Sequence, residues 1–127
     1  MTALLCTAGL LLAWAAAPAQ AEGDAARGGA LAASRSQGLC VLCHALPGQP
    51  APLQGTLGPA LAGVGARLGR EDLRQRLLAP ERLNPETLMP SYGRTEGLQR
   101  VAPALQGRPL LTPGQIDDVV AYLESLK

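Results

Sequence analysis

Residues 40–44 have the sequence Cys-Val-Leu-Cys-His, and this pentapeptide constrains the fold of the chain more than any other feature. C-x-x-C-H is the attachment signature of a c-type haem. The thiols of Cys40 and Cys43 can each add to one vinyl group of the porphyrin, and the imidazole of His44 can reach the iron from the same side. We therefore predict one covalently attached haem c per chain, bound through these three residues, and a fold that encloses it.

Two other kinds of site use the same residue types. A structural zinc site needs four ligands, typically from a second pair of cysteines or histidines. Residues 22–127 offer no further cysteine and no second histidine. A thioredoxin-like cysteine pair is expected in a βαβ setting, and no alternating strand pattern is visible in the chain. A haem requires only the pentapeptide and a ligand on the other face of the iron, so we favour it.

The composition indicates a core that lacks volume. The chain has 127 residues, which is enough for one small domain. It has no phenylalanine, only two tyrosines and a single tryptophan, Trp14. Leucine, valine and alanine alone make a thin core for such a domain, and a porphyrin would supply the missing apolar volume. The formal net charge of +1 argues against nucleic-acid binding, which usually requires a strong basic bias.

The first 21 residues are typical of a secretory signal peptide. The run from 3 to 17 is almost wholly apolar, and Ala19-Gln20-Ala21 is a small-x-small cleavage site. We predict a signal peptide at 1–21, a cytochrome c domain at 22–127 and a periplasmic location. The alternatives are a buried N-terminal helix, a retained anchor, or a different translation start, because no Lys or Arg precedes the apolar run.

Three helices are predicted, and no strand. Residues 22–37 form the first, with Asp24 as N-cap and Gly38 at its end, and its paired glycines Gly28 and Gly29 suggest the close approach of another helix. Residues 69–79 form a short second helix. The last helix begins at Thr112-Pro113-Gly114-Gln115, a capping box with proline at the first helical position. Apolar residues follow it at helical spacing, namely Ile116, Val119, Val120 and Leu123. The fold class is therefore all-α, with extensive loops.

The second iron ligand is predicted by elimination. His, Met, Cys and Tyr are the usual axial ligands, and Met89 is the only methionine of residues 22–127. It lies in the proline-flanked sequence Leu88-Met89-Pro90, where a rigid loop can position a weak thioether ligand. Tyr92, Tyr122, the single lysine Lys127 and a vacant position are the alternatives. We predict His44 and Met89 as the two iron ligands.

Further groups could support the haem. The other ring nitrogen of an iron-bound histidine needs an acceptor, and the carbonyls around Pro59 in the segment 58–63 are candidates. Arg67, Arg70 and Arg94 could contact the haem propionates, but we interpret each of them as a solvated surface residue.

The pattern as a whole resembles that of class I cytochromes c. The shared features are an N-terminal helix, the haem signature, a Gly-Pro loop, a methionine loop and a C-terminal helix. In that family the N- and C-terminal helices cross where a small residue meets an aromatic one, and Gly28 or Gly29 with Tyr122 fits this crossing. The resemblance implies a class I cytochrome c fold with these helices crossing around the covalently bound haem.

A closer resemblance, to the SoxX family, covers nearly all of residues 22–127. SoxX is the monohaem subunit of the periplasmic SoxAX sulfur-oxidation complex. The stretches that carry this resemblance are 38–44, 57–67, 84–92, 107–112 and 116–123. The sequence Asn-Pro-Glu-Thr-Leu-Met-Pro at 84–90 and the extended segment after it favour this subfamily.

The resemblance implies a role that the residues alone do not show. SoxAX is an L-cysteine S-thiosulfotransferase that oxidatively joins thiosulfate to a cysteine of the SoxYZ carrier protein. The chemistry is assigned to a haem of the SoxA subunit, and the SoxX haem relays electrons to a small acceptor cytochrome c. The implied partners are thus SoxA in a heterodimer, SoxYZ transiently, and the acceptor cytochrome, with no nucleic acid and no membrane after signal cleavage. No catalytic residue is expected on this chain.

Two alternatives are considered beside this role. A free-standing electron carrier would have the same haem and the same ligands, and a non-haem structural protein would have neither. Residues 93–111 have little regular pattern and are long for a connector. We hypothesise that part of this segment, together with the haem edge, docks the SoxA-type subunit.

Overall fold

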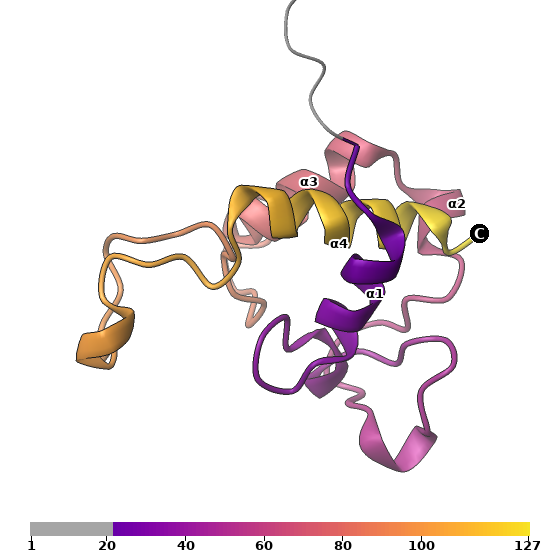
Figure 1. Ribbon diagram of the computed structural model, residues 1–127, viewed down its shortest axis with the longest axis horizontal. Helices are drawn as coiled ribbons and strands as arrows, with labels where there is room; N and C mark the ends of the chain where they lie inside the picture. Colours follow the sequence, from indigo (N-terminus) through magenta and orange to yellow (C-terminus); the bar gives the residue numbers. More distant parts are fainter. Residues whose placement is uncertain (1–21) are drawn as a thin grey trace, which may run out of the picture.

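The computed structural model describes residues 22–127, and within that range the chain has helices but no strand (Figure 1). The all-α prediction is therefore confirmed. The predicted signal peptide at 1–21 lies outside the described residues. The α-helices are α1 (Ala25–Ala33), α2 (Val64–Arg67), α3 (Arg70–Leu78) and α4 (Pro113–Ser125). Four short 3₁₀ turns lie at Cys40–Leu42, Ala51–Leu53, Pro80–Arg82 and Pro103–Leu105.

Helix α1 begins as predicted but ends earlier. The Asp24 carboxylate accepts a hydrogen bond from the backbone N–H of Arg27, so Asp24 is the N-cap. The prediction that the helix continues to residue 37 was wrong, because it ends at Ala33. The hydroxyl of Ser34 accepts the backbone N–H of Gln37 over 3.1 Å, which gives the chain an alternative to helical hydrogen bonding. The backbone then turns back so tightly that a Cβ at Gly38 would lie 2.2 Å from the Leu31 carbonyl oxygen.

Helix α4 is the central element, and its start follows the predicted capping box. The Thr112 hydroxyl accepts the Gln115 N–H, and the Gln115 side chain accepts the Thr112 N–H over 2.9 Å. Pro113 occupies the first turn. The predicted apolar face is buried, and its members are Ile116, Val119, Val120 and Leu123. This face forms the centre of the core, so the hydrophobic pattern places the helix correctly.

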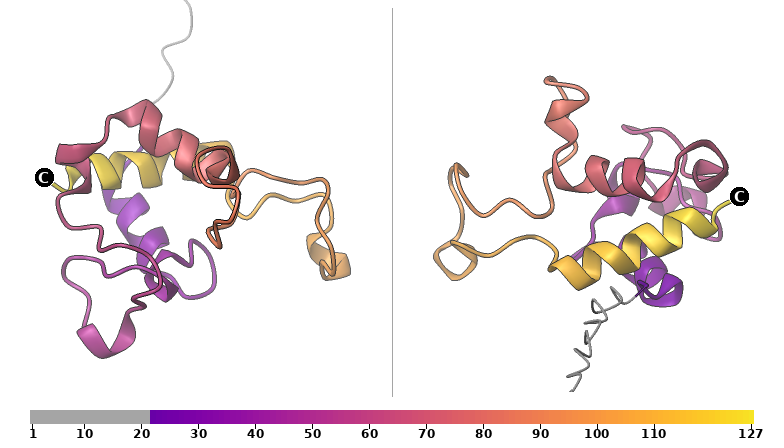
Figure 2. Two further views of the ribbon diagram at one scale, coloured as in Figure 1. Left: turned by 180° about the vertical axis from the view of Figure 1, so that it is seen from behind. Right: turned by 90° about the horizontal axis from the view of Figure 1, so that it is seen from above.

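Helix α1 crosses α4 and packs against it more extensively than any other pair of helices (Figures 1 and 2). A Cβ at Gly28 would lie 1.9 Å from the carbonyl oxygen of Asp118, so only glycine allows this approach. A Cβ at Gly29 would lie 3.1 Å from the Tyr122 ring. The predicted meeting of paired glycines with an aromatic residue is therefore confirmed, and so is the predicted helix crossing.

A carboxylate closes the same crossing at the start of α1. Asp118 is buried on α4 and accepts the backbone N–H of Asp24 over 2.7 Å and the Arg27 Nε–H over 2.9 Å. The hydrogen bonds from these two donors lower the pKa of Asp118 below its ordinary value, and the bond from Arg27 has the larger effect. The crossing thus combines backbone contact with a fixed ionic hydrogen-bond group.

Helix α3 lies within the predicted 69–79 segment and packs against α4. Leu73 and Leu77 point inward and are almost fully buried. Gly65, in the short helix α2, touches the end of α4, where a Cβ would lie 2.3 Å from the Glu124 carbonyl oxygen. Helices α2 and α3 therefore cover one side of α4.

Residues 94–110 leave the body of the molecule as an extended arm, whereas Leu111 is buried in the core (Figures 1 and 2). Its only regular element is the turn Pro103–Leu105, so the prediction of an irregular segment is confirmed. The two ends of the arm meet where the Leu111 N–H donates to the Tyr92 carbonyl oxygen over 3.1 Å. Three leucines along it are exposed to solvent, namely Leu98, Leu105 and Leu110.

Candidate haem site

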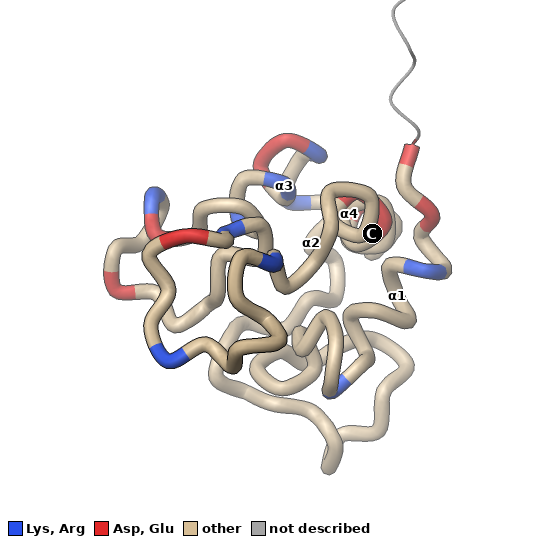
Figure 3. The backbone as a smooth tube through the Cα atoms, turned by 60° about the vertical axis from the view of Figure 1, so that its left-hand side comes forward, with Lys and Arg blue, Asp and Glu red and all other residues tan. Residues whose placement is uncertain are grey.

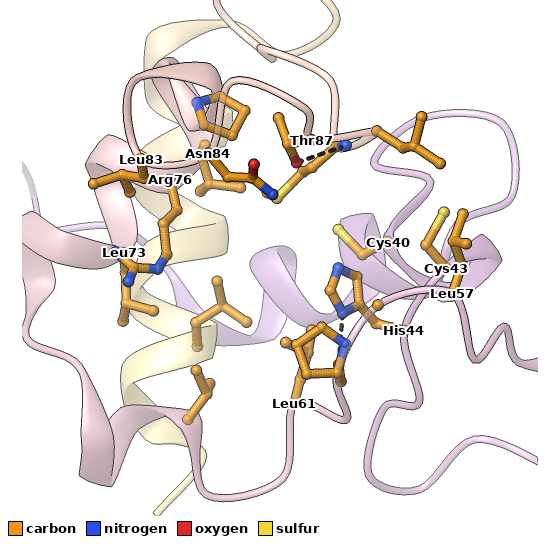
Figure 4. A pocket seen from close by; sticks show the side chains of 18 of the residues that line it. Cys40, Cys43, His44, Leu57, Leu61, Leu73, Arg76, Leu83, Asn84 and Thr87 are labelled. Carbon is orange, nitrogen blue, oxygen red and sulfur yellow. Dashed lines mark hydrogen bonds between the residues drawn. The ribbon is translucent and has the colours of Figure 1, made fainter.

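The cysteine loop is a tight turn that gathers the predicted attachment residues. The backbone N–H groups of Cys43 and His44 both donate to the Cys40 carbonyl oxygen, over 3.1 and 2.9 Å. Leu39 precedes this turn with a φ of 63°, a left-handed conformation that a leucine rarely adopts. Both sulfurs and the imidazole are thereby brought to one cavity, which Figure 4 shows from close by.

The imidazole of His44 is held by a backbone carbonyl. Its Nδ1 lies 2.6 Å from the Pro59 carbonyl oxygen, which can only accept a hydrogen bond. The Nδ1 therefore carries the proton, and the lone pair is on Nε2, which is the state that an iron ligand requires. The predicted acceptor in the Gly-Pro loop is confirmed.

Gly58 fixes the plane of the same ring. A Cβ at this position would lie 2.4 Å from His44 Cε1 and 2.7 Å from Nδ1, so the loop backbone packs directly on the imidazole. The Gly58 N–H also donates to the Cys43 carbonyl oxygen over 2.7 Å. The position and tautomer of the ring are thus set by two neighbouring residues of one loop.

The cavity that these groups face has a volume of about 780 Å³. All four residues predicted to bind the cofactor line it, so the structure brings Cys40, Cys43, His44 and Met89 together. Most of the remaining lining is apolar and comes from the Gly-Pro loop, the methionine loop and helices α2, α3 and α4. It includes Leu57, Leu61, Val64, Leu68, Leu73, Leu77, Leu83, Leu88 and Leu123. Paired thiols, an imidazole with a free lone pair and an apolar hollow of this size fit a covalently bound haem.

The loop that carries Met89 is held by its own polar side chains. The Thr87 hydroxyl accepts the Met89 N–H, and the Asn84 side-chain oxygen accepts the Glu86 N–H, both over 3.1 Å. On the far side of Met89, the Ser91 hydroxyl donates to Glu81 over 2.7 Å. Asn84 and Thr87 also line the cavity opposite His44 (Figure 4). These supports were not predicted from the sequence, although Asn-Pro is a known turn signal.

The other candidate iron ligands are occupied elsewhere. Lys127 donates its Nζ to the Gly65 carbonyl oxygen over 2.8 Å, and the Tyr122 ring packs on Gly29. Tyr92 does line the cavity, but its hydroxyl donates to the Gly38 carbonyl oxygen over 2.7 Å. Burial raises the pKa of the Tyr92 phenol, which keeps it protonated. The geometry therefore favours Met89 among the alternatives.

Only one of the three arginines considered from the sequence reaches the cavity. Arg70 pairs with Glu124 over 2.6 Å, and Arg94 pairs with Glu81. Arg67 lines the cavity and also donates to the Ala62 carbonyl oxygen. Arg76, which sequence analysis missed, extends into the cavity from α3 (Figure 4). Its spacing from Leu73 places the two on one helical face, which is the signal that could have identified it.

No helix within 22–127 is long and apolar enough to cross a membrane. No group of three or more His, Cys, Asp or Glu side chains in that range could hold a metal ion.

Residues 25–127 match the model of the cytochrome c family. The chain therefore belongs to the cytochrome c family, whose members carry covalently bound haem c and transfer electrons. Both the predicted fold class and the predicted cofactor are confirmed by this membership.

A solved structure refines the assignment within the family. A chain in the crystal structure of SoxXA from P. pantotrophus is 30% identical to this one, with a TM-score of 0.75. The match covers 84% of each chain. No curated protein is significantly similar in sequence. The resemblance to SoxX predicted from the sequence is confirmed, and the chain is a SoxX-type cytochrome.

Proposed function

We propose that this chain is the electron-relay subunit of a periplasmic SoxAX-type complex. Such a complex oxidatively joins thiosulfate to a cysteine of a carrier protein. The observation that carries the proposal is the placement of His44 and Met89 on the lining of one apolar cavity in a chain similar to part of SoxXA. An iron bound by both side chains has no open position for a substrate.

In this proposal Cys40 and Cys43 would each hold the haem through a thioether, because a thiol can add across a vinyl group. His44 would bind the iron through Nε2, while Pro59 keeps Nδ1 protonated and the ring in place. Met89 would supply the thioether ligand from its braced loop. When bound, the haem supplies single-electron transfer. Residues of this chain hold it, exclude water and set its potential, and none of them acts on thiosulfate.

The surface around the cavity supports docking by apolar contact. No Asp, Glu, Lys or Arg occurs between Arg35 and Arg67, so the cysteine loop and the Gly-Pro loop are free of these charges (Figure 3). Leu42 and Leu53 are exposed outside the cavity, and three leucines that line it, namely Leu57, Leu83 and Leu88, are also exposed. The other exposed leucines lie on the arm. Exposed apolar patches of this kind mark interaction sites.

We propose that the arm and the leucines around the cavity contact the SoxA-type subunit. The test is co-expression of this chain with that subunit in a host that attaches haem c, followed by co-purification. A variant whose residues 94–110 are replaced by a short Gly-Ser linker should lose most of the partner. Arg70→Gln, which alters a charge away from the arm, is the control. Retention of the partner by the linker variant would contradict arm docking.

The relay itself is tested with the reconstituted complex. Thiosulfate and the carrier protein should reduce the haem of this chain when the SoxA-type subunit is present, and not without it. If that subunit turns over with an artificial electron acceptor while this haem stays oxidised, the relay proposal is wrong. A chain that never associates with the subunit but exchanges electrons with other cytochromes would be a free-standing carrier.

The proposed location has a separate test. Mass spectrometry of protein exported by such a host should find a mature chain that begins at Glu22 and carries the mass of one haem. A chain that retains residues 1–21 in the exported fraction would contradict cleavage after Ala21.

A further inference from the structure

Tyr92 joins the two sides of the cavity. Its phenol is only 3% exposed, and its hydroxyl donates to the Gly38 carbonyl oxygen over 2.7 Å. The same hydroxyl lies 3.9 Å from Cys40 Sγ. Gly38 belongs to the cysteine loop, and Tyr92 directly follows the loop that carries Met89. One side chain therefore connects the segments that carry the groups predicted to lie on opposite faces of the haem.

The backbone of Tyr92 is also fixed in place. Its N–H donates to the Leu77 carbonyl oxygen at the end of α3 over 2.9 Å. Its carbonyl accepts the Leu111 N–H, which closes the base of the arm. Tyr92 is thus held at both ends. Its hydroxyl contacts the cysteine loop, and its backbone contacts helix α3 and the base of the arm.

A weak ligand depends on such a connection. The thioether of methionine binds iron less strongly than an imidazole, so its occupancy depends on how well the protein holds it near the metal. The methionine loop is braced locally by Thr87 and Ser91, but those contacts stay on its own side of the cavity. The Tyr92 hydroxyl bond reaches across to the cysteine side, to which the haem would be attached.

We propose that Tyr92 is a positioning residue that keeps the methionine loop at bonding distance from the haem iron. It does so through its hydroxyl bond to Gly38, and it does not touch the iron. This inference rests on the proposed ligation by Met89. Removal of the hydroxyl lets the loop move outward, so an added ligand displaces Met89 more easily.

The test is imidazole binding to the oxidised holoprotein. Binding is measured from the shift of the Soret band and from the loss of the near-infrared sulfur-to-iron band. Tyr92→Phe should bind imidazole about threefold to tenfold more tightly than the wild type, which corresponds to the loss of one buried hydrogen bond. Tyr122→Phe is the matched control, because the Tyr122 ring packs on Gly29 and its hydroxyl forms no hydrogen bond within residues 22–127. Equal affinities in Tyr92→Phe and the control would overturn the proposal.

A second measurement covers the case in which Tyr92→Phe fails to fold or to retain haem. The chain has two tyrosines, so in the Tyr122→Phe background Tyr92 is the only one. Incorporation of 3-fluorotyrosine then makes a single hydroxyl a stronger donor with almost no change of shape. Measured near pH 6, imidazole affinity should fall relative to the unlabelled variant, and an unchanged affinity would contradict the proposal. A wild type without the near-infrared band would instead refute ligation by Met89.

Discussion

The Nδ1 of His44 donates a hydrogen bond to the carbonyl oxygen of Pro59 over 2.6 Å. A carbonyl cannot donate, so this contact fixes the tautomer of the imidazole and leaves the Nε2 lone pair for a metal. A hydrogen bond at the far nitrogen also increases the electron density that the ring offers to iron. The backbone of the Gly-Pro loop thus prepares the ligand before any contact with the iron.

The close packing of Gly58 on the His44 imidazole predicts the effect of Gly58→Ala. The added Cβ would lie 2.4 Å from His44 Cε1, so the imidazole or the loop must shift and the Pro59 bond must lengthen. We expect a loss of about 1–3 kcal/mol in the free energy of unfolding, as for overpacked cores, and a changed reduction potential. Gly114→Ala is the control, since no atom lies within 4 Å of its added Cβ. Unchanged potential and stability in Gly58→Ala would contradict the tight packing.

Met89→Ala tests the ligand on the other side of the cavity. Loss of the thioether should lower the reduction potential, because methionine ligation raises it. The near-infrared band of the oxidised protein should disappear, and exogenous ligands should bind readily. Leu53→Ala alters a leucine that is 58% exposed and does not line the cavity, and should leave both properties unchanged. A surviving band in Met89→Ala would show that another residue binds the iron.

The parts of the fold that the sequence predicts well are those defined by local patterns. The capping box at Thr112 and the apolar face of α4 depend on residues within one helix, and both are present as predicted. The cysteine loop is equally local. The end of α1 also depends on local contacts, but two signals compete there. Gly38 predicts a helix end near residue 37, whereas the Ser34 hydroxyl already accepts the Gln37 N–H and the chain turns back to meet Leu31. A serine can also lie within a helix, so the sequence alone does not show which signal ends it.

The same distinction applies to the site. Cys40, Cys43 and His44 follow from one motif, and Met89 follows from elimination. Arg76 and Tyr92 belong to the cavity only because α3 and the base of the arm fold over it. The spacing of Arg76 from Leu73 places it on the buried face of α3, but no spacing rule relates that face, or Tyr92, to the cysteine loop.

Asp118 predicts a pH dependence of stability. Its pKa in the folded protein is lowered, first by the hydrogen bond from Arg27 and then by that from the Asp24 N–H. The ionised carboxylate therefore stabilises the fold at pH values above about 4, the ordinary pKa of aspartate. That contribution is lost as the pH falls through the lowered value.

Asp118→Asn should remove this part of the acid sensitivity. We expect a loss of about 1–2 kcal/mol near pH 7, where the charge-assisted hydrogen bonds are present, and a smaller difference from the wild type near pH 3. Chemical denaturation at several pH values measures both quantities. Glu96→Gln, at an exposed position on the arm, is the control. A difference that is constant with pH would show that the charge of Asp118 does not contribute.

Cys40→Ala links cofactor attachment to folding. The cavity of about 780 Å³ is lined mostly by apolar side chains, many of them leucines, and without a porphyrin these would face water or collapse. Helices α1 and α4 pack directly on each other, so they can persist when the cavity loses its occupant. We expect Cys40→Ala to bind haem through Cys43 alone, with a lower yield and a lower midpoint of thermal unfolding.

Removal of both thiols should produce a partly ordered chain. Cys40→Ala combined with Cys43→Ala should retain helical circular dichroism from α1 and α4 but expose the leucines around the cavity, which a fluorescent apolar dye would detect. Leu42→Ala, which changes an exposed side chain between the two cysteines, controls for disturbance of the loop. The doubly substituted chain could instead unfold cooperatively at the wild-type temperature and bind no dye. That result would mean that the helices alone specify the fold and that the haem adds no stability.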